Sequence, residues 1–373
     1  MTLTAAQELK FTLLAEGLSI EPRALLHLRD VVPGGALTSA DYASTSGLIL
    51  ELEDSVWVNA PIREHNPNFV ATDTPQSLDV VGDRLVVRSR GREYPVRFWP
   101  QPAYHGSSNQ YGLLNNYVVT HGDRARLSPL RGCAMTCLFC NIPYDDPLEV
   151  YATKPVDACL EALRTALADP VQPAHHVLVS GGTPKPKDVG HHRALYRAVL
   201  EALPDVDVDI MMAPLPGLLD LPELHSLGVH ELSVNIEVFS RERARVLARN
   251  KFHQGINIYL DCIERASQIL GPGRARSMLL VGLEPPDDTL RGVTAIAERG
   301  GTPVLSPFRP DPATPLCHLR PPSAAELSDI YLRATDVVQH YGIRLGPFCP
   351  PCSHNTLTLV EPGDRPYHRP VMV

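Results

Sequence analysis

The sequence lacks a hydrophobic run long enough to cross a membrane. A transmembrane helix needs about 20 consecutive apolar residues, and no stretch of the 373 residues approaches that length. The first ten residues also lack the basic start and apolar centre of a secretory signal peptide. We therefore expect a cytoplasmic protein with no membrane partner.

Lysine is also scarce. Lysine occurs at only five positions, and the formal net charge is −8. A protein that binds a nucleic-acid backbone needs a basic face to neutralise the phosphates. The charge therefore argues against a nucleic-acid partner and favours a small-molecule substrate. An apolar content of 44% with 20% charged residues is ordinary for a globular chain.

Cysteine is absent before residue 133, but eight cysteines follow from there. Three of them, Cys133, Cys137 and Cys140, lie within eight residues in the spacing Cys-x3-Cys-x2-Cys, and Phe139 precedes the last. Thiols stay reduced in the cytoplasm, so metal binding or catalysis is favoured over disulfides. A loop this short cannot form an ordinary disulfide from two of these sulfurs and still leave the third a role.

Three neighbouring thiolates can hold three corners of an iron–sulfur cube, because thiolates are the usual ligands of such clusters. The fourth iron of a [4Fe–4S] cluster would then be open to a chelating small molecule. The amino and carboxylate groups of S-adenosylmethionine (SAM) would fill that position. A three-cysteine zinc site and a cluster of free thiols are the alternatives.

This spacing, including Phe139, resembles the signature of the radical SAM superfamily. The resemblance implies an enzyme that holds a [4Fe–4S] cluster on the three cysteines and SAM on the open iron. An external one-electron donor of the flavodoxin or ferredoxin type would reduce the cluster. Cleavage of SAM would then give methionine and a 5′-deoxyadenosyl radical, which abstracts hydrogen from a substrate. A biosynthetic step in specialised metabolism is a hypothesis, and the fate of the substrate radical is not indicated by any motif.

The pattern from about residue 123 to 312 alternates short apolar strands with helices. Strands are predicted near 124–128, 177–180, 206–212, 231–237, 275–284 and 303–308, and helices near 155–168, 190–203, 221–227, 240–248, 256–270 and 287–299. Such βα units predict a parallel sheet with right-handed crossovers. The predicted fold is α/β, a partial (βα)6 barrel of the TIM type, which the resemblance also implies.

Two further segments flank this barrel. Residues 1–122 are predicted as a small β-rich accessory domain that is helical to about residue 30, with Pro22 as a breaker. Its strands lie between about 46 and 100 and include a hairpin that turns at Gly82-Asp83. It either orders the barrel by packing on it or contributes to the substrate pocket. Residues 313–373 are predicted as a helix over 323–341 and a cysteine-containing tail.

Chemistry in a βα barrel is expected at the carboxyl ends of the strands. The second strand ends in Gly181-Gly182-Thr183, which resembles the glycine motif that receives the amino group of SAM. An ordinary tight turn is the alternative. After the fourth strand, Asn235 and Glu237 alternate with apolar residues and so point to one face. Inside a barrel they would need polar partners, and the resemblance implies the ribose hydroxyls of SAM.

Three charged residues complete the predicted cofactor site. Glu284 ends a fifth-strand stretch that resembles the motif lining the adenine side. Arg249 and Lys251 follow the fourth strand, and either would give the SAM carboxylate a cation. For all three, a solvated surface charge is the alternative.

The sequence of residues 232–312 is most similar to the branch that contains biotin synthase and lipoyl synthase. The chain departs from that branch, because no extra cysteines precede Cys133. Cys159 and Cys262 fall within predicted helices, where free cysteine is usually part of the core. Sulfur insertion by the routes of those enzymes is therefore not supported.

The tail holds the remaining cysteines. Cys349 and Cys352 flank Pro350-Pro351, and Cys317 lies upstream. These three thiols are predicted to hold an auxiliary cluster, or zinc together with His354. Alternatively they are catalytic thiols that quench a substrate radical. The rival for the whole chain is a non-catalytic iron–sulfur or zinc protein, either an electron carrier or a scaffold.

Overall fold

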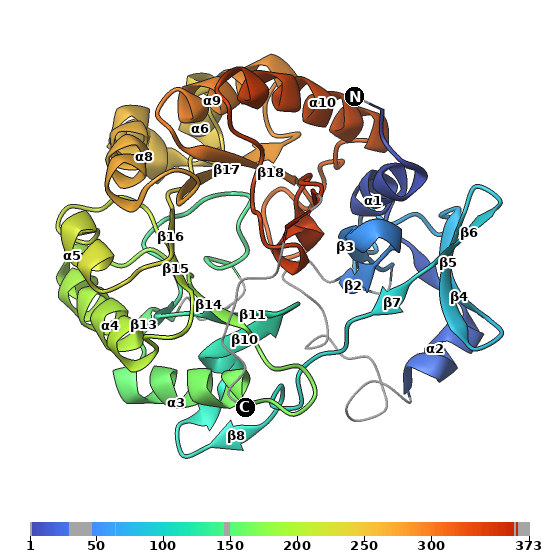
Figure 1. Ribbon diagram of the computed structural model, residues 1–373, viewed down its shortest axis with the longest axis horizontal. Helices are drawn as coiled ribbons and strands as arrows, with labels where there is room; N and C mark the ends of the chain where they lie inside the picture. The colour runs from blue at the N-terminus through green and yellow to red at the C-terminus, as the bar shows by residue number, and fades with distance from the viewer. Residues whose placement is uncertain (1, 30–46, 64, 145–149, 362, 365–373) are drawn as a thin grey trace.

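The computed structural model describes residues 2–29, 47–63, 65–144, 150–361 and 363–364 (Figure 1). The last nine residues of the predicted tail and residues 30–46 of the predicted accessory domain lie outside this description. No helix in the described ranges is long and apolar enough to span a bilayer.

A seven-stranded sheet forms the centre of the molecule. Its strands, in spatial order, are β10 (Val118–His121), β11 (Arg124–Leu127), β14 (His176–Val179), β15 (Val208–Met211), β16 (Glu231–Ser233), β17 (Ala275–Val281) and β18 (Thr302–Pro307). The six strands from β11 onward in this order are parallel, and β10 is antiparallel to β11. The six parallel strands confirm the predicted partial barrel. β10 was not predicted.

Helices follow the strands and cover the outside of the curved sheet (Figure 1). They are α3 (Val156–Leu167), α4 (Val189–Ala202), α5 (Leu221–Ser226), α6 (Arg241–Leu247), α7 (Arg249–Gln254), α8 (Ile256–Leu270), α9 (Pro286–Ala297) and α10 (Ala324–His340), with the short η4 (Pro186–Asp188) before α4. Each long helix buries one apolar stripe, as the 3.6-residue period requires. Cys159 lies on the buried stripe of α3, as expected of a core cysteine.

The amino-terminal segment contains two helices and two small sheets. The helices are α1 (Ala5–Glu16) and α2 (Pro22–Arg29), and Pro22 begins α2, where a proline costs no hydrogen bond. One sheet has the order β1 (Ser19–Ile20), β4 (Gln76–Val81), β5 (Arg84–Ser89) and β6 (Arg92–Pro95). The other has the order β3 (Trp57–Pro61), β2 (Gly47–Glu51) and β7 (Arg97–Phe98), with η2 (Glu53–Ser55) between β2 and β3. The hairpin at Gly82-Asp83 is confirmed by the pairing of Val81 with Arg84.

Short elements connect this segment to the barrel. They are the pair β8 (Ser108–Asn109) and β9 (Gly112–Leu113), η3 (Leu114–Asn116), and the pair β12 (Leu130–Arg131) and β13 (Ala152–Thr153) beside the cysteine loop. The predicted boundaries at residues 122 and 312 stay predictions. β10, on the amino-terminal side of the first boundary, already belongs to the central sheet.

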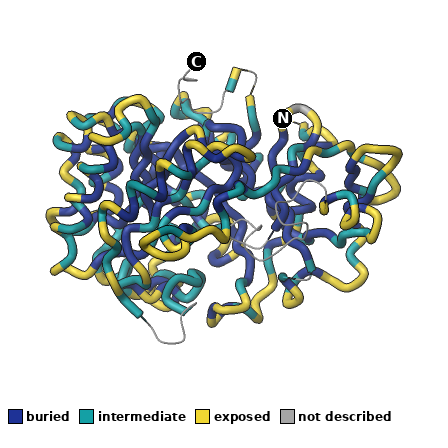
Figure 2. Tube along the Cα trace, turned by 90° about the horizontal axis from the view of Figure 1, so that it is seen from below, coloured by how far each residue is buried: buried dark blue, intermediate teal, exposed yellow. Residues whose placement is uncertain are grey.

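One hydrophobic core runs through the amino-terminal segment and the barrel (Figure 2). α1 packs on α10, where the rings of Phe11 and Tyr331 lie 5.4 Å apart. The ammonium of Lys10, also on α1, is buried and donates to the carbonyls of Ser353 (2.9 Å) and Thr358 (2.6 Å). The segment is therefore packed against both the barrel and the tail.

The tail covers the gap between the two ends of the curved sheet. After α10 it runs beside β18, where the Leu357 N–H donates to the Leu305 carbonyl over 2.8 Å. Its η5 (Pro351–Asn355), which precedes Leu357 in the chain, lies against the turn before β11. A Cβ added to Gly122 in that turn would be 3.3 Å from the Cβ of Pro351. Figure 1 shows η5 between β18 and β11. The tail thus contacts the first and the last parallel strand together.

Candidate active site

A pocket of about 550 Å³ of empty space opens at the carboxyl ends of the parallel strands. Its walls come from the cysteine loop, the turn after β14, the segments after β15 and β16, and α7. The lining residues are Cys133, Met135, Cys137, Phe139, Cys140, Ile142, Ser180, Gly181, Thr183, Met211, Met212, Ala213, Asn235, Glu237 and Lys251. The three cysteines and five of the residues predicted to bind SAM therefore surround one space.

Backbone donors orient the first cysteine. The Cys133 sulfur accepts N–H groups from Met135 (3.3 Å) and Thr183 (3.1 Å). The Ala134 N–H in turn donates to the Thr183 carbonyl over 2.9 Å. Two N–H donors aimed at one sulfur fix its position in the loop, and cysteine sulfurs are the usual ligands of iron–sulfur clusters.

The other two cysteines are more enclosed. Burial raises the pKa of the Cys140 thiol to about 12 and raises that of Cys137 as well. As free thiols both would remain protonated at neutral pH. Because a bound metal deprotonates a coordinating thiol outright, a cation beside Cys137 and Cys140 would convert both into thiolate ligands. The donor set therefore fits an iron–sulfur cluster.

The glycines after β14 allow close packing against the cysteine loop. A Cβ on Gly182 would lie 1.8 Å from the Gly132 carbonyl oxygen. Gly182 does not line the pocket, whereas its neighbours Gly181 and Thr183 do. Gly182 thus holds the cysteine loop against the strand end, and Gly181 and Thr183 face the space beside the sulfurs.

Asn235 and Glu237 both face the pocket after β16, as the alternating pattern predicted. The Asn235 Oδ1 accepts the Ser233 hydroxyl (2.8 Å) and the Met278 N–H (3.1 Å), which fixes the amide plane. Glu237 has a φ of +67° and pairs with Leu279 of β17 through an isolated bridge. A left-handed conformation is uncommon for a glutamate and is more frequent at functional sites.

Lys251 neutralises this carboxylate. Its Nζ lies 2.7 Å from the Glu237 Oε2 and donates to the Asn235 carbonyl, also over 2.7 Å. Burial alone would lower the pKa of Lys251, but the Glu237 carboxylate, Tyr259 and Cys137 together outweigh burial and raise it. The lysine is therefore charged, and it joins α7 to the strand end that carries Asn235 and Glu237.

Comparison with known families assigns this region. Residues 127–294 match the family model of the radical SAM superfamily, and they include all three cysteines and every pocket residue. This region, somewhat less than half of the chain, therefore resembles a radical SAM domain. The match supports an enzyme of the radical SAM class, for which a [4Fe–4S] cluster and SAM are implied.

Individual relatives of the radical SAM domain are distant. Over 145 residues the chain is 23% identical to the bacteriochlorophyllide c C-7(1)-hydroxylase of Chlorobaculum limnaeum, and the match covers 36% of each protein. Among solved structures, it is similar to the coproporphyrinogen III oxidase HemN of Escherichia coli (19% identity, 60% and 54% of the two chains, TM-score 0.42). It is also similar to a radical SAM methyltransferase from Sphaerobacter thermophilus (15% identity, 73% and 76% of the two chains, TM-score 0.43). None of these relatives confirms the biotin synthase and lipoyl synthase branch.

Two predicted residues of the radical SAM domain lie away from the pocket. Arg249 is exposed at the start of α7. Glu284 is buried, and burial raises its pKa, but it accepts the Ser240 N–H (2.6 Å) and the Thr289 hydroxyl (3.2 Å). Because these bonds join the start of α6 to α9, the structure gives Glu284 a role in holding the two helices together. Their roles toward SAM stay predictions.

Asn250 was missed by the sequence reasoning. Its Oδ1 accepts both the N–H and the hydroxyl of Thr136, each over 3.2 Å, and the Leu138 N–H donates to the Leu247 carbonyl over 2.9 Å. These bonds tie the cysteine loop to α6 and α7. A single asparagine in a polar helix carries no pattern in the sequence that could have revealed this contact.

The tail cysteines do not gather as predicted. Cys349 and Cys352 are buried at the amino ends of β11 and β14, the opposite end of the strands from the pocket. Cys317 lies in the loop after β18, where its carbonyl accepts the Asn68 amide over 3.0 Å. The Nδ1 of His354 donates to the Pro351 carbonyl over 2.6 Å, and burial lowers the pKa of this histidine to about 3. An auxiliary cluster on Cys317, Cys349 and Cys352 is therefore not shown, and the position of Cys349 and Cys352 does not favour contact with a substrate in the pocket.

Proposed function

We propose that the chain binds a [4Fe–4S] cluster on Cys133, Cys137 and Cys140 and SAM beside it, and acts on a small-molecule substrate. When bound, these groups supply a 5′-deoxyadenosyl radical that abstracts hydrogen from that substrate. The observation that carries the proposal is the single pocket shared by the three cysteines with Gly181, Thr183, Asn235, Glu237 and Lys251.

The chain's own residues divide the work between two walls. On one wall, the N–H groups of Met135 and Thr183 hold the Cys133 sulfur toward the pocket. On the other, the locked Asn235 amide and the Glu237 carboxylate offer hydrogen-bonding groups suited to ribose hydroxyls. Lys251 pairs with the Glu237 carboxylate over 2.7 Å and so holds its oxygens in place beside the pocket as hydrogen-bond acceptors.

Apolar residues close the space between these walls. Met211, Met212 and Ala213 follow β15 and line the pocket together with Ile142. Such a lining excludes water, which would otherwise quench a reactive intermediate. The proposal also includes a one-electron donor of the flavodoxin or ferredoxin type.

The test measures iron and 5′-deoxyadenosine together. After anaerobic reconstitution the wild type should hold about four irons per chain and form 5′-deoxyadenosine from SAM in the presence of a strong reductant. The Cys133→Ala/Cys137→Ala/Cys140→Ala variant should lose both. Cys262→Ala, which removes a half-buried thiol of α8 outside the pocket, should keep both.

Two outcomes would refute the proposal. Iron without SAM cleavage, and without any spectral change on adding SAM, would favour the rival function of an electron carrier or scaffold. Iron that persists in the triple variant would place the cluster elsewhere in the chain.

A further inference from the structure

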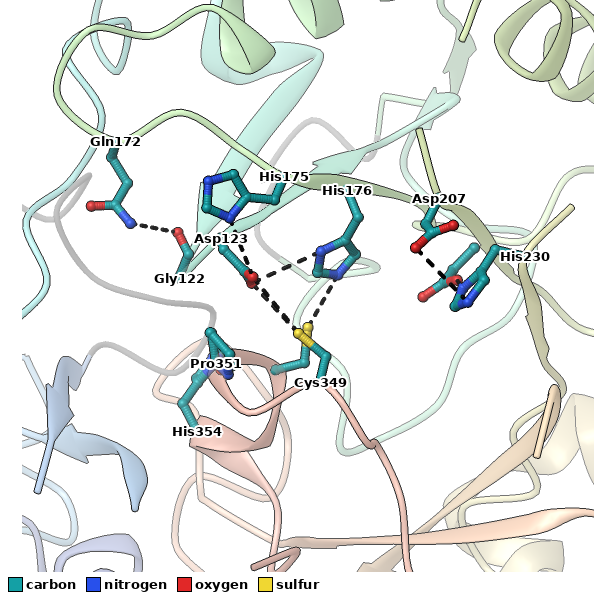
Figure 3. Close-up of polar contacts among 12 residues, drawn as sticks. Gly122, Asp123, Gln172, His175, His176, Asp207, His230, Cys349, Pro351 and His354 are labelled. Atoms are coloured by element: carbon teal, nitrogen blue, oxygen red, sulfur yellow. Dashed lines mark hydrogen bonds and ion pairs between the residues drawn. The ribbon is translucent and has the colours of Figure 1, made fainter. Parts of the chain in front are cut away.

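Four metal-ligating side chains meet at the opposite end of the barrel from the active-site pocket. Asp123 precedes β11, His176 begins β14, and Cys349 and Cys352 come from the tail. All four are buried, and none is more than 3% exposed. Figure 3 shows the Asp123 carboxylate directed toward the Cys349 sulfur, with the His176 ring beside them.

The spacing of the donor atoms is that of a tetrahedral site. The Cys352 sulfur lies 3.2 Å from the His176 Nε2, and the Cys349 sulfur lies 3.7 Å from the nearer Asp123 oxygen. One ligand atom from each residue lies within 4.8 Å of all the others. Zinc bonds of about 2.0–2.3 Å in tetrahedral geometry place neighbouring donors about 3.3–3.8 Å apart. The group therefore needs only small shifts to enclose an ion.

We propose that Asp123, His176, Cys349 and Cys352 bind a structural Zn²⁺ ion. Thiolates, an imidazole and a carboxylate are all zinc ligands, whereas the protein ligands of a cubane cluster are usually cysteines only. With all four ligands from protein, the ion has no open position and so no catalytic role. The ion would lie at the amino ends of the strands, and residues on that face of a βα barrel usually serve stability rather than catalysis.

Neighbouring groups support the ligands. The Nδ1 of His176 lies 3.9 Å from an Asp123 oxygen, and His175 approaches the same carboxylate at 3.8 Å. In the tail, the Ser353 N–H donates to the Pro350 carbonyl over 3.0 Å, which closes the turn between the two cysteines.

A second acidic group in the described part of the chain shows the contrast. Asp209, Glu231 and His230 also lie close together, but the guanidinium of Arg276 is 3.0 Å from Asp209 and 2.6 Å from Glu231. Arg276 thus supplies the positive charge there. The Asp123 group instead contains two cysteine thiols and an imidazole, which are ligands that zinc prefers.

The ion would fasten the tail across the barrel. Asp123 and Cys349 are 226 positions apart in the chain. The tail also bonds to β18 through Leu357, so an ion on Cys349 and Cys352 would connect both ends of the curved sheet. This inference does not rest on the proposed reaction, because no residue of the group lines the active-site pocket.

The test is metal analysis of the full chain, purified without added zinc. Wild type and the Cys133→Ala/Cys137→Ala/Cys140→Ala variant should each hold one zinc per chain. His176→Ala and Cys352→Ser should lose it, whereas the matched control His175→Ala should keep it. With Co²⁺ in place of zinc, the wild type should show the visible bands of a tetrahedral ion and a thiolate charge-transfer band.

Several results would overturn the proposal. They are wild type without zinc and without Co²⁺ bands, a Cys349–Cys352 disulfide found by mass spectrometry, or equal zinc loss in His175→Ala and His176→Ala. Retention of iron on the cysteine loop shows that a zinc-free variant is folded. If the variants fail to fold, Co²⁺ titration of the wild type decides the question.

Discussion

Lys251 shows how a residue can line the pocket, as the sequence suggests, and still have a neighbour that the sequence does not reveal. The sequence predicts a cation for the SAM carboxylate at Arg249 or Lys251. In the structure Lys251 lines the pocket, but its charge is paired with Glu237 over 2.7 Å. The ion pair joins Lys251 to a residue 14 positions earlier in the chain, and no local sequence pattern predicts that pairing.

The first prediction compares these two cations. Lys251→Met would leave Glu237 enclosed without its partner, a loss that costs about 3 kcal/mol or more for a buried pair. We expect SAM affinity of the cluster-loaded protein to fall at least tenfold, a change of about 1.4 kcal/mol. Arg249→Met should change it little because Arg249 is exposed. Equilibrium binding of SAM measures both. Equal losses in the two variants would contradict the role given to Lys251.

The second prediction concerns Lys10, whose burial lowers its pKa from 10.5 to about 7. Between these values the unfolded chain holds a proton that the folded protein has released. Stability should therefore rise with pH from about 7 to 10.5, by at most about 1.4 kcal/mol per pH unit, and be unaffected by this group below pH 7. Lys10→Met should remove that part of the slope. Urea unfolding at pH 7, 8 and 9 measures it, and parallel slopes in both proteins would refute it.

At the scale of elements, the alternation of strands and helices was predicted well because both are set by local periodicity. All six parallel strands lie where apolar runs placed them, and their carboxyl ends meet by topology alone. The pocket could therefore be predicted from residues that follow strands. α7, β10 and the Asn250 contact could not, because short elements and single side-chain bonds depend on the neighbours that the fold supplies.

The third prediction tests the contact between two such elements. In Gly182→Ala the new methyl would collide with the Gly132 carbonyl at 1.8 Å and displace the cysteine loop. We expect loss of most iron after reconstitution while the helical circular dichroism is retained. Gly190→Ala, in α4 where a Cβ meets nothing within 4 Å, should keep full iron and gain about 0.5–1 kcal/mol of stability. A Gly182→Ala protein with full iron would show that the loop can give way.

At the scale of the whole molecule, the sequence suggests an accessory domain that ends at residue 122. The local sequence pattern changes near that residue, and a boundary predicted from sequence alone rests on such local changes. The contacts that join the segments are distant in sequence, among them Phe11 with Tyr331 and Lys10 with Ser353. Such pairs leave no local signature, which is also why the tail cysteines were grouped with Cys317 rather than with His176.

The fourth prediction asks whether the amino-terminal segment unfolds alone. Phe11 is fully buried against α10, and Phe11→Ala should cost about 3–5 kcal/mol. We expect one cooperative thermal transition that shifts as a whole to lower temperature. Leu26→Ala, at a residue 58% exposed on α2, should shift it little. Calorimetry that shows two transitions, with only the first displaced, would instead establish a separate domain.

The position of the tail sets an order of events during synthesis. Cys349 leaves the ribosome 226 residues after Asp123, an interval of about 10–45 s at typical rates of translation. All six parallel strands emerge within it, so the sheet can form while the amino ends of its strands are still open to water. Until the tail is synthesised, the amino ends of the strands in the nascent barrel therefore remain uncovered and accessible to chaperones.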